Sequence, residues 1–237
     1  MSIKAILFDL DGTLLPMNLD VFVKDYFGRL AKHLVPHGFE PEKLIKTIWQ
    51  GTGAMVANDG GATNEARFWQ SFAEVYGEEV MAKESEFERF YIEKFDLVRA
   101  SCGFDEGAPR AVAALKERGY RLILATNPIF PSIATYKRVA WAGLDTDDFE
   151  LITTYENSSF CKPNPGYYRE ILEKTGLSPE ECLMVGNDVG EDMIASELGM
   201  KVFLIPRDLI NKNNKDISVY PSGDFDALVE YVDGITD

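Results

Sequence analysis

The sequence predicts an α/β fold built on a doubly wound parallel sheet, with a helical domain inserted into it. Three features of the 237-residue chain indicate this fold. A short apolar, β-branched run at residues 3–7 is typical of a buried strand. Residues 16–103 then show helical periodicity only. Beyond them strand and helix patterns alternate, which is typical of a parallel sheet with helices on both faces.

Four helices are predicted in the inserted segment. The first begins at Asn18, whose side chain can cap it, and ends at Pro36 and Gly38. Pro41 begins the second, because proline is favoured at the first helical position. Aromatic residues at helical spacing are expected to form the core of this segment. Glycine-containing connections are expected at 51–53 and 58–63, and the third and fourth helices at about 66–76 and 78–95.

The alternating part of the chain supplies the remaining elements of the sheet. Strands are predicted at 120–125, 151–154, 182–185 and 201–205, and helices at 109–118, 165–175, 191–198 and 225–232. One sheet needs all five strands for its core, so the helical segment must form a discontinuous second unit. The predicted domains are a Rossmann-like α/β core, residues 1–15 and 104–237, and a helical domain, residues 16–103.

Composition excludes several classes of protein. A hydrophobic content of 46% and a charged content of 27% are those of an ordinary globular chain. Lys and Arg number 24 against 39 Asp and Glu, and the net charge of −15 argues against nucleic acid or an anionic membrane as partner. No stretch approaches the ~20 apolar residues of a membrane span, and no signal peptide is recognised. We expect a cytoplasmic protein.

The cysteines and histidines do not predict a metal centre. Cys102, Cys161 and Cys182 are an odd, scattered set, which indicates reduced thiols in a cytosolic protein. His33 and His37 lie at one polar helix end. We expect them to be surface residues, because the sequence shows no third ligand beside them.

Two carboxylates, Asp9 and Asp11, follow the first strand, and Gly12 comes directly after them. In an open α/β sheet, ligands bind outside the carboxyl ends of the strands. Two neighbouring carboxylates raise each other's pKa unless a cation intervenes. A hard divalent ion with oxygen ligands, most simply Mg²⁺, would be such a cation. The alternative is that this stretch is only a turn after a strand.

Polar side chains also follow the later strands. Thr126 and Asn127 could donate hydrogen bonds to a phosphoryl oxygen, or could simply cap the next helix. Lys162 could balance the acids of the site, or be a solvated charge. Asp188 and Asp192 are four residues apart and would face the same way if a helix has begun, although an acidic helix start also satisfies the helix dipole.

The order and spacing of these groups resemble the four motifs of the haloacid dehalogenase superfamily. The first motif of that superfamily is an apolar run followed by DxDGT, which Asp9 to Thr13 match. The resemblance covers essentially the whole predicted core. It implies that residues 16–103 form the helical cap that the superfamily inserts after the first motif. Such a cap closes over the site and selects the substrate, and Arg67, Arg89 and Arg99 are candidates for that selection.

The resemblance also implies a role for each site residue. Asp9 would be the nucleophile and Asp11 the general acid/base. The phosphoryl group would be held by Thr126, Asn127 and Lys162, and Mg²⁺ by the Asp9 carboxylate, the Asp11 carbonyl and the Asp188 carboxylate, with Asp192 in support.

Two departures from the superfamily pattern affect these assignments. The fourth motif usually begins Gly-Asp, but this chain has Asn187 in that place and Asp188 one residue later. We favour Asp188 as the metal ligand because asparagine lacks the charge, and the alternative is the amide oxygen of Asn187. Pro128 follows Asn127, so the chain offers no backbone N–H to a substrate there.

The expected function is that of a Mg²⁺-dependent phosphatase acting on a small phosphorylated metabolite through an aspartyl-phosphate on Asp9. A phosphomutase on the same core is an alternative, and so is a non-catalytic protein that binds phosphorylated ligands. A dehalogenase is disfavoured because Asp11 supplies an acid that halide displacement does not need. The sequence predicts neither the substrate nor the oligomeric state.

Overall fold

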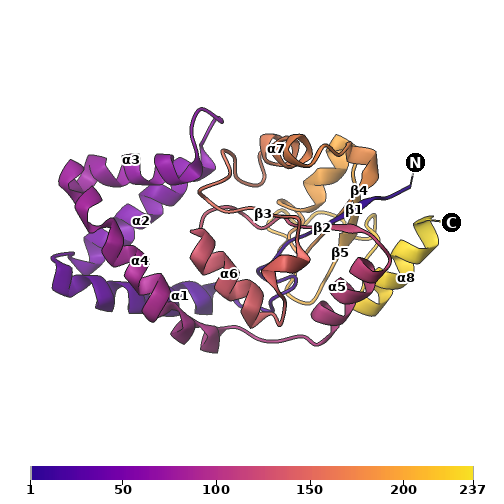
Figure 1. The fold of residues 1–237 in the computed structure, drawn as a ribbon, viewed down its shortest axis with the longest axis horizontal. Coiled ribbons are helices and arrows are strands. Elements are labelled where there is room, and N and C mark those ends of the chain that lie inside the picture. The colour runs from indigo at the N-terminus through magenta and orange to yellow at the C-terminus, as the bar shows by residue number, and fades with distance from the viewer. Residues whose placement is uncertain (1, 237) are drawn as a thin grey trace.

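The computed structural model describes residues 2–236 and contains a five-stranded, all-parallel sheet with the strand order β3-β2-β1-β4-β5 (Figure 1). The α/β prediction is confirmed. The strands are β1 (Ala5–Phe8), β2 (Arg121–Leu124), β3 (Leu151–Ile152), β4 (Cys182–Gly186) and β5 (Lys201–Leu204). Each lies within one or two residues of its predicted range.

The sheet is covered on both faces because its apolar residues alternate between them. On β1, Ile6 and Phe8 belong to one buried cluster, and Ala5 and Leu7 to the other. The first cluster includes residues of α5 (Gly107–Glu117), α6 (Ser132–Trp141) and α8 (Phe225–Thr236). The second includes residues of α7 (Pro165–Thr175) and of the 3₁₀ helix η6 (Met193–Leu198).

The strand order reverses beside β1. The chain passes from β1 to β2 and β3 on one side, then crosses to β4 and β5 on the other. Such a reversal opens a crevice outside the carboxyl ends of the two central strands. Asp9 follows β1 and Asn187 follows β4, so the first and fourth motifs meet at this crevice.

Residues 16–103, called here the helical block, lie to one side of the sheet (indigo to magenta in Figure 1). The side chain of Asn18 accepts a hydrogen bond from the Val21 amide, and Pro41 occupies the first turn of α2, as predicted. No helix within residues 2–236 has the length and apolarity needed to cross a membrane. The block contains α1 (Leu19–Leu34), η1 (Val35–His37), α2 (Pro41–Val56), α3 (Asn64–Tyr76), η2 (Glu78–Lys83), α4 (Glu84–Glu93) and η3 (Phe95–Ser101).

The two connections between the block and the sheet run side by side. Met17 and Cys102 form an antiparallel bridge, and the Gly103 amide donates a hydrogen bond of 2.8 Å to the Pro16 carbonyl. The chain therefore leaves the sheet region and returns to it at nearly the same point.

Several elements differ from the prediction. The segment 78–95 is divided into η2, α4 and the start of η3, and the segment 191–198 forms the 3₁₀ helix η6 after a turn. Helix α6 was not predicted, although Pro131 before Ser132 and Gly143 after Trp141 are ordinary start and stop signals.

Helix α2 also continues through the glycines predicted to interrupt it. Gly51 is buried, and a Cβ atom there would lie 2.6 Å from Cδ2 of Phe68 on α3. The glycine is needed for the close approach of two helices, and the helix itself is held by packing.

Gly51→Ala is expected to destabilise the protein, whereas Gly53→Ala stabilises it. An added methyl at Gly51 overpacks the contact with Phe68 at a cost of about 1–3 kcal/mol. This cost outweighs the gain in helix propensity, which is about 1 kcal/mol. A Cβ at Gly53 meets nothing within 4 Å, so only the gain of about 1 kcal/mol remains. Urea unfolding of both variants measures the difference. Equal stabilisation by both would contradict the close packing of α2 on Phe68.

Candidate active site

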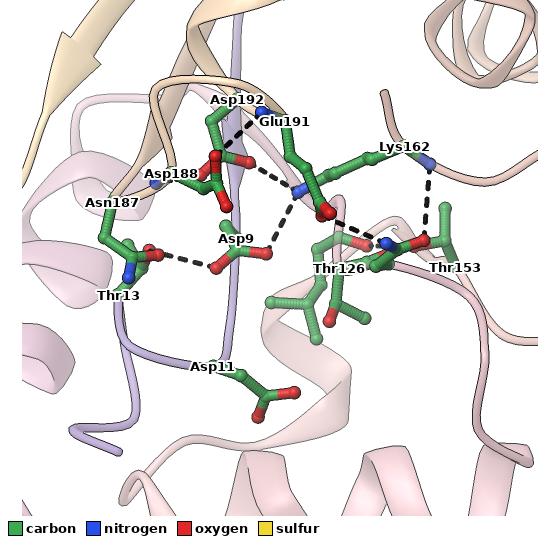
Figure 2. A network of polar contacts seen from close by, with 12 residues as sticks. Asp9, Asp11, Thr13, Thr126, Thr153, Lys162, Asn187, Asp188, Glu191 and Asp192 are labelled. Atoms are coloured by element: carbon green, nitrogen blue, oxygen red, sulfur yellow. Dashed lines mark hydrogen bonds and ion pairs between the residues drawn. The ribbon is translucent and has the colours of Figure 1, made fainter. Parts of the chain in front are cut away.

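The predicted site residues from all four motifs converge at the carboxyl edge of the sheet (Figure 2). Asp9 extends β1, and Thr126 and Asn127 follow β2. Lys162 precedes α7, and Asp188 and Asp192 follow β4. These side chains come from distant parts of the sequence and meet because parallel strands end at one edge.

Lys162 is the centre of the network. Its Nζ lies 3.0 Å from Oδ1 of Asp9 and 2.6 Å from Oδ1 of Asp192, and the side chain is 1% exposed. Burial alone would lower the pKa of Lys162, but the carboxylates of Asp192 and Asp9 outweigh it, so the pKa lies well above its usual value. The lysine is therefore a permanent cation at this edge of the sheet.

Thr13 and Asn187 brace the other side of Asp9. The Thr13 hydroxyl lies 3.0 Å from Oδ2 of Asp9 and 3.0 Å from Oδ1 of Asn187. The Asn187 amide donates to the Asp208 carbonyl at 2.6 Å. A Cβ on Gly12 would lie 2.3 Å from Nδ2 of Asn187, and φ of Gly12 is +87°. Both ends of the Asn187 amide thus contact protein groups, which suits a bracing role.

No helix has begun at Asp188, so the condition under which Asp188 and Asp192 would share a helix face is not met. Oδ1 of Asp188 accepts hydrogen bonds from the amides of Gly190 (2.7 Å) and Glu191 (3.0 Å), so the chain turns here before η6 begins. Both bonds go to Oδ1, and Oδ2 remains for another ligand. Asp192, 1% exposed, accepts from the Asp188 amide at 2.9 Å and from Lys162. It therefore fixes both the lysine and the loop.

The amide of Asn127 is used within the protein. It donates to Oε2 of Glu191 at 3.0 Å, and its oxygen accepts from the Lys162 amide at 3.2 Å. The carbonyl of Thr126 accepts from Thr153 at 2.7 Å. Glu191 was not predicted as a site residue. Burial, with repulsion from Asp188, raises the pKa of its carboxyl.

Asp11 is turned away from Asp9 and Lys162 (Figure 2) and forms an ion pair with Arg138 of α6. Arg138 is 0% exposed, and its guanidinium lies over the Phe130 ring at 4.4 Å. Oδ1 of Asp11 is buried without a hydrogen-bond partner among the described residues. Burial raises the pKa of Asp11, and Arg138 opposes this. Sequence analysis missed Arg138 because it missed α6.

The donor set fits a hard divalent ion. Asp9 and Asp188 bring carboxylate oxygens to the crevice, and the Asp11 carbonyl lies on the same loop as Asp9. Lys162 pairs with Asp9 and Asp192, whereas Asp188 has no cationic partner within residues 2–236. An uncompensated carboxylate beside Asp9 is the chemistry that a bound cation would satisfy.

A second group of possible ligands lies in the helical block, where the sequence had shown none. His33, His37 and Glu86 have ligand atoms within 4.8 Å of one another, so the premise that no third ligand exists was wrong. However, the Glu86 carboxylate is already 3.0 Å from Arg89 and 3.4 Å from His37, and a cation would have to displace these contacts. The three side chains are half-buried.

The fold and the site together define a class. In α/β proteins with a parallel sheet, ligands bind where the strand order reverses. In this chain that place holds Asp9, which follows β1 and pairs with the buried Lys162. The model of the haloacid dehalogenase-like hydrolase family matches residues 3–197. The chain belongs to this family and is a hydrolase, as the motifs predicted.

Individual relatives and solved structures match nearly the whole chain. A glyceraldehyde 3-phosphate phosphatase of Methanothermobacter thermautotrophicus is 26% identical over 92% of this chain and 95% of its own. The crystal structure of a HAD phosphatase from Thermococcus onnurineus has a TM-score of 0.62 at 20% identity, covering 99% of this chain and 100% of that one. YfnB of Bacillus subtilis, described as bound to magnesium and as showing interdomain movement, has a TM-score of 0.57 at 19% identity, with 98% and 100% covered.

Proposed function

We propose that the protein is a Mg²⁺-dependent phosphatase that hydrolyses a phosphate monoester through an aspartyl-phosphate on Asp9. One observation carries the proposal: Asp9 lies between the Lys162 ammonium and the Thr13 hydroxyl, with the Asp188 carboxylate beside it (Figure 2). The relatives named as phosphatases support the same chemistry. A cytoplasmic location belongs to this proposal and is supported by three cysteines that are free thiols.

In this mechanism Asp9 attacks phosphorus in line and displaces the alcohol, which divides one difficult step into two. Lys162, Thr126 and Asn127 would bind phosphoryl oxygens, Asn127 through the second hydrogen of the amide group that donates to Glu191. Thr126 and Asn127 line the cavity that Asp9 also lines. Mg²⁺, held by Asp9, Asp188 and the Asp11 carbonyl, would supply neutralisation of charge on the phosphoryl oxygens. Asp192 keeps Lys162 in place. Water then hydrolyses the aspartyl-phosphate.

Asp11 would protonate the departing alcohol and later remove a proton from the attacking water. Its carboxylate must first turn from Arg138 toward Asp9, because in this structure it points away from the nucleophile. We propose that residues 16–103 act as a cap over this site and that residues 1–15 and 104–237 form the catalytic core. The two connections run side by side at Met17 and Cys102, and Met17 lines the same cavity as Asp9, which suits such a movement.

Asp188→Ala is expected to weaken Mg²⁺ binding far more than Asn187→Ala. The Asp188 variant loses a charged ligand whose Oδ2 is available to the metal. The side chain of Asn187 is instead hydrogen-bonded to Thr13 and Asp208. Titration of Mg²⁺ by calorimetry should show an affinity at least about tenfold lower for Asp188→Ala, the usual scale for a perturbed metal site. A larger loss for Asn187→Ala would reverse the assignment of the ligand.

A phosphate-release screen over phosphorylated metabolites, with and without Mg²⁺, tests the function itself. A Mg²⁺-dependent phosphatase releases inorganic phosphate with the metal present and not without it. A phosphomutase would instead transfer the group to another hydroxyl of the substrate and retain a bisphosphate. Binding of phosphorylated ligands without any release would favour a non-catalytic protein.

A further inference from the structure

A cavity of about 1140 Å³ extends from Asp9 and Asp188 into the helical block. This volume exceeds the 300–1,000 Å³ or so of typical pockets for drug-sized ligands. A phosphoryl group and a small sugar or acid would fill only the part near the sheet. The remainder must therefore hold a larger part of the ligand or stay filled with water.

The part of the cavity inside the block has mainly aromatic and aliphatic walls. Its lining includes Phe22, Phe27, Leu30, Ile48, Phe68 and Phe87, which come from α1, α2, α3 and α4. All of them but Phe68 are buried, whereas Leu19, Trp49 and Met81 of the same lining are exposed. The buried side chains form the body of this wall, and the exposed ones leave apolar surface facing the cavity. An apolar ligand group placed there would remove that surface from water.

The charged groups in the lining are mostly acidic. Glu65 and Glu156 lie at the boundary between the block and the sheet, and Oε2 of Glu156 is buried without a hydrogen-bond partner among the described residues. Oε1 of Glu156 accepts from the Ser132 amide at 2.8 Å. Burial, with repulsion from Glu156, raises the pKa of Glu65. These carboxylates would repel a second anionic group and could accept hydrogen bonds from a donor.

The arginines expected to select an anionic substrate do not line the cavity. Arg67 pairs with Asp59, Arg89 pairs with Glu86, and Arg99 lies outside the lining. Lys212, which lies on the side of the sheet, is the one Lys or Arg among the described residues that line the cavity.

We infer that the substrate is the phosphate monoester of a bulky, mainly apolar alcohol that carries an amine and no second anionic group. The inference rests on the proposed phosphatase function and names its substrate class. The phosphate would bind beside Asp9, the apolar part would contact Trp49 and Phe68, and the amine would face Glu65 and Glu156.

A series of alkyl phosphates tests this, because ethyl, octyl and 8-aminooctyl phosphate have leaving groups of similar reactivity. Each buried methylene is worth about fourfold in binding, so three buried groups predict a kcat/KM for octyl phosphate at least about 50-fold above that for ethyl phosphate. The terminal amine should raise kcat/KM roughly a further tenfold through a charged hydrogen bond, and Glu65→Gln should abolish that increase. Phosphoglycolate, which carries a carboxylate, should be a poor substrate.

Two valines of α1 provide a matched pair of variants. Val23 lines the cavity, whereas Val21 is 52% exposed and lies outside the lining. Val23→Asp should lower the ratio of octyl to ethyl kcat/KM at least about tenfold, because it places a charge on an apolar wall. Val21→Asp should leave the ratio unchanged.

The two proposals fail in different ways. Phosphate release from phosphoglycolate above that from octyl phosphate, or equal rates for ethyl and octyl phosphate, would overturn the substrate class and leave the phosphatase function standing. If no phosphate monoester is hydrolysed, calorimetry with octylphosphonate and ethylphosphonate still tests the cavity. Tighter binding of the octyl compound would then support the apolar ligand class without catalysis, and equal binding would overturn it.

Discussion

Asp9→Asn should reduce phosphate release by at least about 10⁴-fold, the scale of loss when a nucleophile is removed. The amide is a poor nucleophile, and it cannot form an acyl phosphate that water then hydrolyses. Oδ1 and Oδ2 of Asp9 contact Lys162 and Thr13, so an asparagine of the same shape keeps the local packing. Release of inorganic phosphate and mass spectrometry of acid-quenched protein measure the result.

The unmodified protein should carry a phosphoryl label on the peptide containing Asp9, and the variant should carry none. Asp226→Asn is a suitable control, because that carboxylate is exposed at the start of α8 and pairs with Arg110 far from the site. Turnover by Asp9→Asn within tenfold of the unmodified rate would exclude Asp9 as the nucleophile.

Asp11→Asn should retain the fold at lower stability, because Arg138 loses its counter-charge, and should keep metal binding but lose about 10²–10⁴-fold in turnover, the range typical of general acid–base catalysis. The backbone carbonyl remains available to the metal, and the amide oxygen can still accept a hydrogen bond from Arg138. Both protonation of the leaving group and activation of water would suffer. The effect should therefore depend on the substrate.

A substrate with a good leaving group, such as 4-nitrophenyl phosphate, needs little protonation. Rapid-quench kinetics of Asp11→Asn should then show a burst of nitrophenol and an accumulated phosphoprotein, because hydrolysis of the intermediate stays slow. Asp9→Asn should show neither. Turnover by Asp11→Asn at the unmodified rate would mean that Asp11 is not the acid/base.

Much of the fold follows from local patterns. Apolar runs of four or five residues define the strands, and signals such as Asn18, Pro41 and Gly176 define helix ends within one or two residues. Gly51 misled the prediction because a glycine signals a break locally, whereas this one allows Phe68 to approach. That distinction depends on tertiary packing, which propensity does not contain.

The positions of several site residues, though not their roles, also follow from the sequence. The sequence predicted that Asp9, Lys162 and Asp188 lie near one another, because parallel strands end at the same edge of the sheet. The contact between Asp11 and Arg138 depends on where α6 packs, and burial of an arginine leaves no local pattern. The cavity escaped prediction for a related reason: aromatic spacing identifies an apolar interior but does not show whether that interior is filled.

The bridge between Met17 and Cys102 has a consequence for how far the sheet depends on the helical block. Because the ends of an 88-residue detour already touch, residues 16–103 could be excised and replaced by a tight turn without moving β1 or α5. What remained would keep its sheet and its acidic edge, but would uncover Trp141, whose ring stacks on Phe95 at 5.0 Å. The helical block is therefore joined to the sheet by two adjacent connections and by the apolar packing of α4 and η3 on α6, and that packing is what its removal would expose.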